Sequence, residues 1–232
     1  MSIHILVAAN EKELADVIAV YLTNDGYTVH KFYTGSEALE CIKNTTLELA
    51  ILDTQLPDMD GFQICKKIRQ NFYYPIIMLS AKSDDCDKIM GLTIGADDYI
   101  TKPITPLEVA ARAKTQLRRY LHYNNSSAKR PGTYEYVIRE LTINRDSHKC
   151  TLSGKELHLT PIEFSILWYL CSHQGIVVSS EELFEAVWGE RALIDNNTVM
   201  AHIGRLREKM SEPARNPKFI KTVWGVGYTI EN

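Results

Sequence analysis

Residues 75–81 read Pro75-Ile76-Ile77-Met78-Leu79-Ser80-Ala81, and this apolar stretch decides the fold class of the first half of the chain. Four consecutive apolar residues predict a strand buried on both faces, as in a parallel sheet covered by helices. Further strands are predicted at Ile3–Val7, Tyr27–Lys31, Leu49–Leu52 and Tyr99–Ile100. Apolar residues at helical spacing predict helices at Glu11–Leu22, Gly35–Lys43, Gly61–Asn71, Asp84–Ile94 and Pro106–Tyr120. Residues 1–120 are therefore predicted to form an α/β domain with a doubly wound, five-stranded parallel sheet.

A different pattern begins after the polar stretch at 121–133, which we interpret as a linker because it is rich in turn formers. Short strands are predicted at Tyr134–Ile138, Leu141–Asn144, Lys149–Leu152 and Leu157–Leu159. Three helices follow, at 160–173, 181–187 and 196–210, and a hairpin is predicted at Ile220–Ile230. A small sheet, three helices and a terminal hairpin over residues 134–232 predict a winged helix-turn-helix domain.

The composition is that of an ordinary globular protein, with 45% hydrophobic and 24% charged residues in a chain of 232. No apolar stretch approaches the roughly 18 residues of a membrane helix, and the N-terminus lacks the features of a signal peptide. The five cysteines, at 41, 65, 86, 150 and 171, have no metal-like spacing, which predicts a reduced, cytoplasmic protein. Residues 1–120 have a net charge of −3 and residues 121–232 a net charge of 0, so the bulk charge does not indicate nucleic-acid binding.

Polar side chains follow several of the predicted parallel strands. Asp53 follows the third strand, Ser80 the fourth and Lys102 the fifth. Because ligands of doubly wound sheets bind outside the carboxyl ends of the strands, we expect these side chains to lie close together. A carboxylate nucleophile beside an ammonium and a hydroxyl that bind phosphoryl oxygens suits a phosphoryl acceptor.

Several motifs of the first half resemble those of the response-regulator receiver domain, which has a CheY-like, flavodoxin-like fold. They are Ile51-Leu52-Asp53, Leu56-Pro57, Asp60-Gly61, Pro75–Ala81 and Gly95–Pro103, in this order. The resemblance implies that Asp53 is the phosphoacceptor, that Ser80 and Tyr99 are the switch pair, and that Lys102 contacts the phosphoryl group. It also implies a sensor histidine kinase as partner and Mg²⁺ as cofactor.

The sequence departs from the receiver pattern in its metal site. Two acidic residues normally follow the first strand, and by register they fall at Ala9 and Asn10. The remaining candidate ligands are the Asp53 carboxylate and the weaker Asn10 carbonyl, whereas Mg²⁺ usually needs one or two carboxylates. We therefore predict weak Mg²⁺ binding and weak or absent phosphorylation, either in a naturally degenerate receiver or through deliberate substitution.

A second set of charged residues matches positions that form cross-dimer salt bridges in the OmpR/PhoB branch of this family. They are Lys88, Asp97, Asp98, Glu108, Arg112 and Arg119. A self-complementary set would fix the register of a two-fold dimer, although each surface pair contributes only about 0–1 kcal/mol. We therefore predict a homodimer formed through the receiver domain. The alternative is an ordinary solvated helix face.

The third helix of the second half is a candidate DNA-reading element. Val199, Ile203, Leu206 and Met210 repeat at helical spacing and are predicted to face the core. The predicted DNA contacts are Asn197, Thr198, Ala201, His202 and Arg205 in the major groove, Arg207 and Lys209 at phosphate, and Lys221, Thr222, Trp224 and Tyr228 from the hairpin. The local charge of +4 over residues 197–221 suits this interpretation.

The second half resembles the winged-helix effector domain of the OmpR/PhoB family. The likeness rests on Leu159–Phe164, Val187–Gly189, His202–Arg207 and Lys221–Tyr228. It implies promoter DNA as partner and, for Gly189–Asp195, a contact with RNA polymerase. Gly204 and Trp224 stand where the family often has arginine, which predicts weaker nonspecific binding and a shallower salt dependence. Leu49–Asp53 and Asn216–Ile220 are similar to regulators of vancomycin resistance, which implies control of genes that remodel cell-wall precursors.

These observations predict a two-domain, sequence-specific transcriptional regulator that is not an enzyme. One alternative is a phosphorylation-independent pseudo-receiver regulator or adaptor. Another is an acyl-phosphate phosphatase or phosphotransferase with Asp53 as its nucleophile. The missing metal carboxylates and the fused DNA-binding module weigh against the enzyme.

Overall fold

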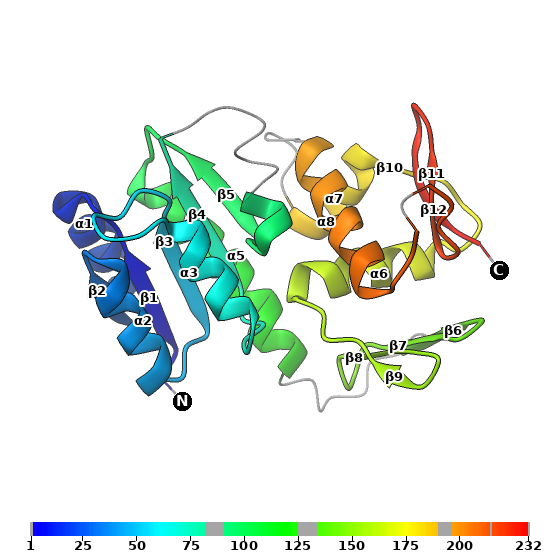
Figure 1. Ribbon diagram of the computed structural model, residues 1–232, viewed down its shortest axis with the longest axis horizontal. Coiled ribbons are helices and arrows are strands. Elements are labelled where there is room, and N and C mark those ends of the chain that lie inside the picture. The colour runs from blue at the N-terminus through cyan, green and yellow to red at the C-terminus, as the bar shows by residue number, and fades with distance from the viewer. Residues whose placement is uncertain (1, 82–90, 125–133, 190–195, 214, 232) are drawn as a thin grey trace. The chain divides into compact units, whose positions relative to one another are not determined.

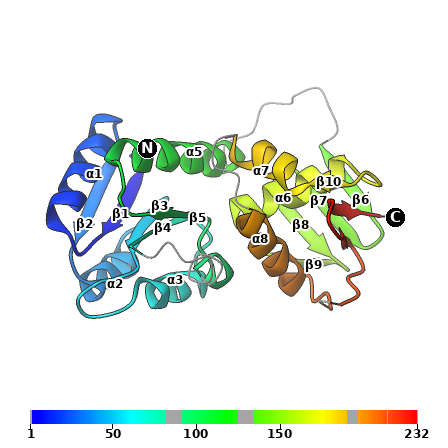
Figure 2. The same ribbon diagram turned by 90° about the horizontal axis from the view of Figure 1, so that it is seen from above.

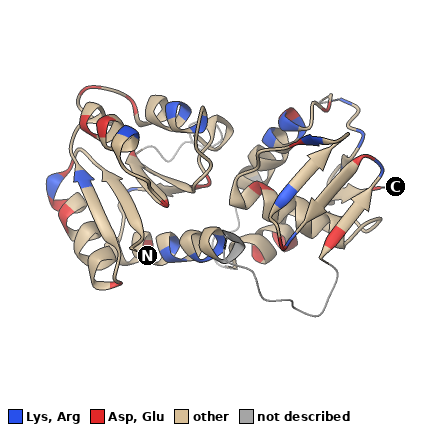
Figure 3. Cartoon of the chain, turned by 90° about the horizontal axis from the view of Figure 1, so that it is seen from below, with Lys and Arg blue, Asp and Glu red and all other residues tan. Residues whose placement is uncertain are grey.

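The computed structural model describes residues 2–81, 91–124, 134–189, 196–213 and 215–231. The chain divides into two compact units, Met1–Tyr120 and Leu121–Asn232, which are coloured blue to green and green to red in Figure 1. Acidic and basic residues are interspersed along the ribbon of both units (Figure 3). Within the described ranges, no helix is both long enough and apolar enough to cross a membrane.

The first unit contains the predicted five-stranded parallel sheet. Its strands are β1 (His4–Ala8), β2 (Thr28–Phe32), β3 (Leu49–Asp53), β4 (Ile76–Ser80) and β5 (Asp98–Thr101), in the order β2-β1-β3-β4-β5. Its described helices are α1 (Lys12–Asn24), α2 (Gly35–Asn44), α3 (Gly61–Arg69) and α5 (Pro106–Asn124). Helices α1 and α5 cover one face of the sheet, and α2 and α3 cover the other (Figure 2). The fold class predicted from the apolar strands is therefore confirmed.

Local interactions hold the start of α3 against the strand that carries Asp53. The Asp60 side chain caps this helix by accepting a hydrogen bond from the Phe62 backbone N–H at 2.8 Å. A Cβ atom at Gly61 would lie 2.2 Å from the Asp53 carbonyl oxygen, so only glycine permits this close approach. The short connection after β3 is thus fixed by its own sequence.

One predicted helix of the first unit lies mostly outside the described residues, and another ends later than predicted. Most of the helix expected at Asp84–Ile94 falls on residues 82–90, outside the described residues, and residues 91–94 are helical. Helix α5 continues to Asn124, so the first four residues of the predicted linker are helical. No glycine or proline interrupts the chain between Pro106 and Asn124, which lets the helix continue past Tyr120.

The second unit contains a four-stranded sheet, three helices and a three-stranded sheet that includes the terminal hairpin. The first sheet consists of β6 (Glu135–Ile138), β7 (Leu141–Asn144), β8 (Lys149–Leu152) and β9 (Lys155–Glu156). The helices are α6 (Pro161–Ser172), α7 (Ser180–Trp188) and α8 (Asn196–Lys209). The second sheet has the order β10 (Val178–Ser179), β12 (Gly227–Ile230), β11 (Ile220–Val223). This arrangement confirms the winged helix-turn-helix.

Two strand predictions in the second unit need correction. The strand expected at Leu157–Leu159 is wrong, because β9 pairs with β8 earlier, at Lys155 and Glu156. The two-residue strand β10 was not predicted, and it pairs with Tyr228 and Gly227 of β12. Such a short strand has no periodic pattern of its own, so only its distant partner defines it.

The described cysteines are buried in the two units. Cys41 and Cys65 lie in the first unit, and Cys150 and Cys171 lie in the second, all as free thiols. Burial raises the pKa of Cys150 and Cys171 to about 12. These side chains pack as small apolar residues of the core.

Candidate functional site

Asp53 ends β3 at the carboxyl edge of the parallel sheet, where its side chain is only 1% exposed. Its Oδ2 accepts a hydrogen bond from Lys102 Nζ at 2.8 Å, and its Oδ1 accepts one from the Gln55 backbone N–H at 3.0 Å. Lys102 Nζ also donates to Glu11 Oε1 at 2.6 Å. The ammonium therefore lies between two carboxylates, one buried and one exposed.

The pKa of Lys102 shows which effect dominates at this edge. Burial lowers the pKa of the ammonium, but the hydrogen bonds to Asp53 and Glu11 outweigh burial and leave the pKa above its usual range. Lys102 is therefore a fixed cation at neutral pH, aimed at the Asp53 carboxylate. A cation in this position suits the binding of an anionic group on Asp53.

The two predicted switch residues are also buried in this part of the sheet. Ser80 ends β4, and its hydroxyl accepts a hydrogen bond from Thr54 Oγ1 at 3.1 Å. Tyr99 lies on β5 in register with Met78, and its ring is 6% exposed. The structure thus brings Asp53 and Lys102 into direct contact and links Ser80 to the same loop through Thr54. The parts played by Glu11 and Thr54 were not predicted.

The donor set at this edge lacks the acidic pair of the receiver pattern, and its carboxylates are those of Asp53 and Glu11, which both pair with Lys102. Ala9 is buried and has no donor atom, and Asn10 is exposed. Among the described residues, no group of three or more His, Cys, Asp or Glu side chains could hold a metal ion. The available Asp53 carboxylate already pairs with Lys102, so a divalent cation would compete with an ammonium group for the same oxygen.

Several predicted dimer residues already have partners within their own unit. Asp98 forms an ion pair with Arg112 at 3.1 Å, and Arg112 also pairs with Glu108 one helical turn earlier, at 3.1 Å. The surface position predicted for Asp97 is wrong, because its side chain is fully buried against Arg69 at 2.6 Å. The predicted residue Lys88 lies outside the described residues, and Arg119 is half-buried on α5.

The outward face of α8 is not the predicted one. Four residues expected to face DNA are buried within the structure: Thr198, Ala201, His202 and Arg205. The exposed positions of the helix are Met200, Gly204 and Glu208, with Asn197 half-buried on the same stripe. The core residues Val199, Ile203, Leu206 and Met210 are buried as predicted. Helix α8 therefore buries more than half of its circumference and leaves a narrow stripe outside.

Arg205 is buried because it belongs to an internal ion-pair cluster. It contacts Glu163 Oε1 of α6 at 2.9 Å, and Lys209 Nζ contacts Glu163 Oε2 at 2.6 Å. Glu163 also accepts the Thr160 backbone N–H at 2.8 Å, which completes the capping box at the start of α6. Burial raises the pKa of Glu163, but Arg205 and Lys209 outweigh it and hold the pKa below its usual range. The cluster fixes α8 against α6.

The terminal hairpin, which we call the wing (Ile220–Ile230), carries the remaining predicted contacts. Trp224 at its turn is 90% exposed, whereas Tyr228 is buried. Lys221 pairs with Glu231. Arg207 of α8 donates to the Ile220 carbonyl at 2.6 Å and to Thr222 Oγ1 at 2.8 Å, so its guanidinium ties α8 to the wing.

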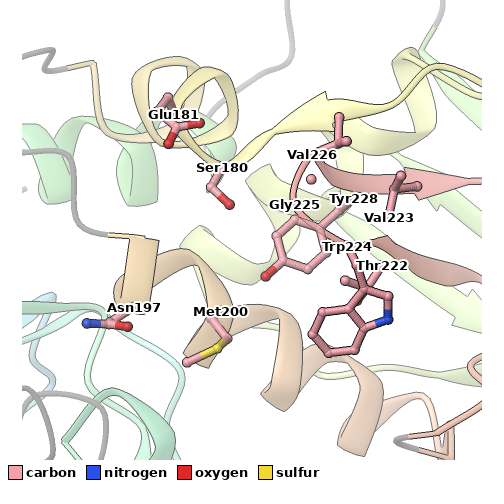
Figure 4. Close-up of a pocket in the computed structure, with 11 residues that line it drawn as sticks. Ser180, Glu181, Asn197, Met200, Thr222, Val223, Trp224, Gly225, Val226 and Tyr228 are labelled. Carbon is pink, nitrogen blue, oxygen red and sulfur yellow. The ribbon is translucent and has the colours of Figure 1, made fainter.

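A hollow of about 320 Å³ separates the first half of α8 from the wing. Figure 4 shows Asn197 and Met200 on its α8 side and the wing residues, including Trp224 and Tyr228, on the other. None of the described residues that line the hollow is basic. The hollow therefore lacks the positive charge of the neighbouring sequence, and Glu181 of α7 adds a negative charge to its lining.

Comparisons with known proteins agree with this architecture. Residues 5–114 match the response regulator receiver domain, and residues 154–230 match the C-terminal domain of transcriptional regulatory proteins. The chain belongs to the response regulators of OmpR/PhoB type, which are transcription regulators and not enzymes. It is 57% identical to Regulatory protein VanRc of Enterococcus gallinarum and 54% identical to Regulatory protein VanR of Enterococcus faecium, with 100% of each chain covered.

A solved structure extends the comparison to coordinates. The response regulator DrrB of Thermotoga maritima, described as an OmpR/PhoB homolog, is similar with a TM-score of 0.52 and 30% identity over 100% of both chains. Receiver domains typically bind Mg²⁺, and a receiver joined to a DNA-binding domain implies a histidine kinase and DNA as partners. The predicted family and fold class are confirmed.

Proposed function

We propose that this chain is a VanR-like promoter-binding regulator whose receiver accepts a phosphoryl group only weakly. The observation that carries the proposal is the composition of the sheet edge. Asp53 has Lys102 at 2.8 Å, whereas Ala9 and the exposed Asn10 supply no carboxylate. The nucleophile and its cationic partner are present, and the acidic pair is replaced.

The chemistry expected at Asp53 is phosphoryl transfer. A carboxylate oxygen of Asp53 forms a new P–O bond while the P–N bond to the histidine of a sensor kinase breaks. Lys102 is within reach of the transferred group and remains charged, and Ser80 supplies a hydroxyl for one phosphoryl oxygen. Tyr99 completes the proposed switch pair.

The rate of phosphoryl transfer to Asp53 is expected to be low, because the negative charge of the transferred group is only partly neutralised. A metal ion normally contributes several kcal/mol to the transition state of such a transfer. Lys102 is a monovalent cation that is shared between Asp53 and Glu11, so it replaces only part of this contribution. Mg²⁺ is expected to bind weakly through Asp53 and Asn10.

The test compares the chain with a variant in which the acidic pair is present, Ala9→Asp with Asn10→Asp. Both are incubated with acetyl phosphate, with and without Mg²⁺, and the aspartyl phosphate is measured by retardation in a phosphate-affinity gel. We expect Mg²⁺-dependent labelling of the variant and little labelling of the parent. Asp53→Asn in both backgrounds is the matched control. Efficient labelling of the parent chain would refute the proposed weakness.

The DNA-binding half of the proposal uses the exposed stripe of α8 and the wing. Candidate base contacts are Asn197, Met200 and the backbone at Gly204, and Trp224 is the candidate wing contact. Thr198, Ala201, His202 and Arg205 are candidates for positioning the helix, since they are buried. Footprinting of promoter fragments with the full chain tests this half, and absence of protection at low salt would contradict it.

A second candidate function is regulation without phosphorylation. Its support is the pairing of Lys102 with both Asp53 and Glu11, which gives the cation partners in the absence of phosphate. The two candidates differ in the DNA affinity of the Ala9→Asp/Asn10→Asp variant before and after labelling with acetyl phosphate, with its Asp53→Asn form as control. A DNA affinity that labelling leaves unchanged favours the phosphorylation-independent function.

The remaining partners are proposed from the family. They are a sensor histidine kinase, RNA polymerase, and a second copy of the chain bound through the receiver, in the cytoplasm. The polymerase contact predicted at Gly189–Asp195 lies outside the described residues, apart from Gly189. For the dimer, the candidates among the described residues are Asp98, Glu108, Arg112 and Arg119, and Asp97 is left out because its side chain is fully buried against Arg69. The similarity to VanR supports control of vancomycin-resistance genes.

A further inference from the structure

Gly204 lies in the interior of α8 and has no packing reason to be glycine. The helix continues on both sides of Gly204, and a glycine inside a helix destabilises it relative to alanine. Apart from chain neighbours and the backbone of its own helix, no heavy atom of the described residues lies within 4 Å of a Cβ built at Gly204. The unit itself would accept a side chain at this position.

The position of Gly204 on the exposed face of α8 suggests a role for the missing side chain. It lies on the exposed stripe, one turn after Met200, and residues four apart share a face of a helix. Met200 is 47% exposed and lines the hollow between α8 and the wing (Figure 4). The exposed stripe therefore presents the apolar side chain of Met200 next to one position, Gly204, where the helix backbone has no side chain over it.

We propose that Gly204 lets α8 approach the base edges closely and that Met200 then contacts the methyl group of a thymine. The inference rests on the proposed binding of promoter DNA by α8. In the major groove the thymine methyl is the apolar group on a base edge, whereas the other groups are hydrogen-bond donors or acceptors. The unbranched, polarisable Met200 side chain suits such a methyl group.

The exposed stripe of α8 suits contact with an apolar group of a base and not hydrogen bonding to a base by arginine. The three cations of α8 have partners within the unit, since Arg205 and Lys209 pair with Glu163 and Arg207 donates to the wing. None of them lines the hollow beside Met200. Sequence selection at this point of the half-site therefore depends on shape and on a methyl contact, with Asn197 as the neighbouring polar group.

The first experiment is a series at position 204, with Gly204→Ala and Gly204→Leu in the full chain. The probe is a duplex that the parent chain selects from a random-sequence pool. We expect the midpoint of thermal unfolding to rise with helix propensity while affinity for the duplex falls, by about tenfold for alanine. A role in folding would move both quantities in the same direction. Unchanged or tighter binding by both variants would overturn the inference.

The second experiment replaces each thymine of the selected duplex by deoxyuridine, which lacks the methyl group. At one position per half-site we expect the parent to bind about fourfold more weakly, the factor for one buried methyl group. Met200→Ala should lose this sensitivity and Met200→Leu should retain it. Val226→Ala, an exposed wing residue that lines the same hollow, is the matched control and should retain it as well.

The outcomes separate this inference from the proposed function. If the chain selects and binds a duplex but deoxyuridine has no effect at any position, the methyl contact is wrong and DNA binding stands. If deoxyuridine weakens the parent and Met200→Ala equally, Met200 is not the reader. If no duplex is selected, the proposed function fails and the inference fails with it.

Discussion

Replacing Glu163 by glutamine would break the ion-pair cluster that holds α8 against α6. Glutamine keeps the size of the side chain and can still accept the Thr160 N–H, but it removes the negative charge. Arg205, which is 6% exposed, and Lys209 then lose the carboxylate that they share. Removing one partner of a buried ion pair costs about 3–5 kcal/mol, and the retained hydrogen bond favours the lower value of about 3 kcal/mol.

The assay is urea unfolding followed by tryptophan fluorescence, because all three tryptophans (Trp168, Trp188 and Trp224) lie in the second unit. With a slope of about 1–3 kcal/mol/M, the midpoint should fall by about 1–3 M. Glu208→Gln, an exposed glutamate of the same helix, is the matched control, with an expected change within about 0.5 kcal/mol. If Glu163→Gln cost no more than this control, the stabilising role of the cluster would be refuted.

Three further predictions concern a buried ion pair of the first unit, the exposed tryptophan of the wing, and the pH dependence of the Glu163 cluster. Asp97→Asn should destabilise the first unit by about 3 kcal/mol through loss of the Arg69 pair, visible in circular dichroism with tryptophan fluorescence unchanged. Trp224→Arg should tighten nonspecific DNA binding and steepen its salt slope by about 1, measured by titration at several salt concentrations. Because the pKa of Glu163 in the folded chain is below its unfolded value of 4.5, its stabilisation is fully present above pH 4.5 and is lost as the pH falls from there through the lower folded-state pKa. The Glu163→Gln variant should therefore show a flatter acid limb in unfolding measured against pH.

The sheet of the first unit could be predicted because its strands carry their own signal. Leu49–Asp53 and Ile76–Ser80 are buried at every position, so a short apolar stretch followed by a polar residue marks both the strand and its functional end. The loop residue Lys102 could be predicted to approach Asp53 because parallel strands end at one edge. The second contact of Lys102, with Glu11, depends on a residue 91 positions away and has no local pattern.

The face of α8 could not be predicted from periodicity alone. The pattern Val199, Ile203, Leu206 identifies one buried line, but this helix packs against both α6 and α7 and buries neighbouring lines too. A charged residue such as Arg205 is normally expected to be exposed. Here it is buried because it pairs with Glu163 on another helix, which the sequence of α8 does not indicate. Gly204 and Met200 are the sequence features that could have indicated the exposed face of α8, since they interrupt an otherwise polar outer stripe.

The buried thiols allow local opening of each unit to be measured by alkylation, without a label being introduced into the chain. Since burial raises the pKa of Cys150 and Cys171 to about 12, almost no thiolate exists at neutral pH in the closed state. Alkylation at these positions therefore waits for local opening, and its rate reports the opening equilibrium. Mass spectrometry of peptides containing Cys41 or Cys65 gives the same information for the other unit. If promoter DNA binds through the second unit as proposed, it should slow modification of Cys150 and Cys171 selectively.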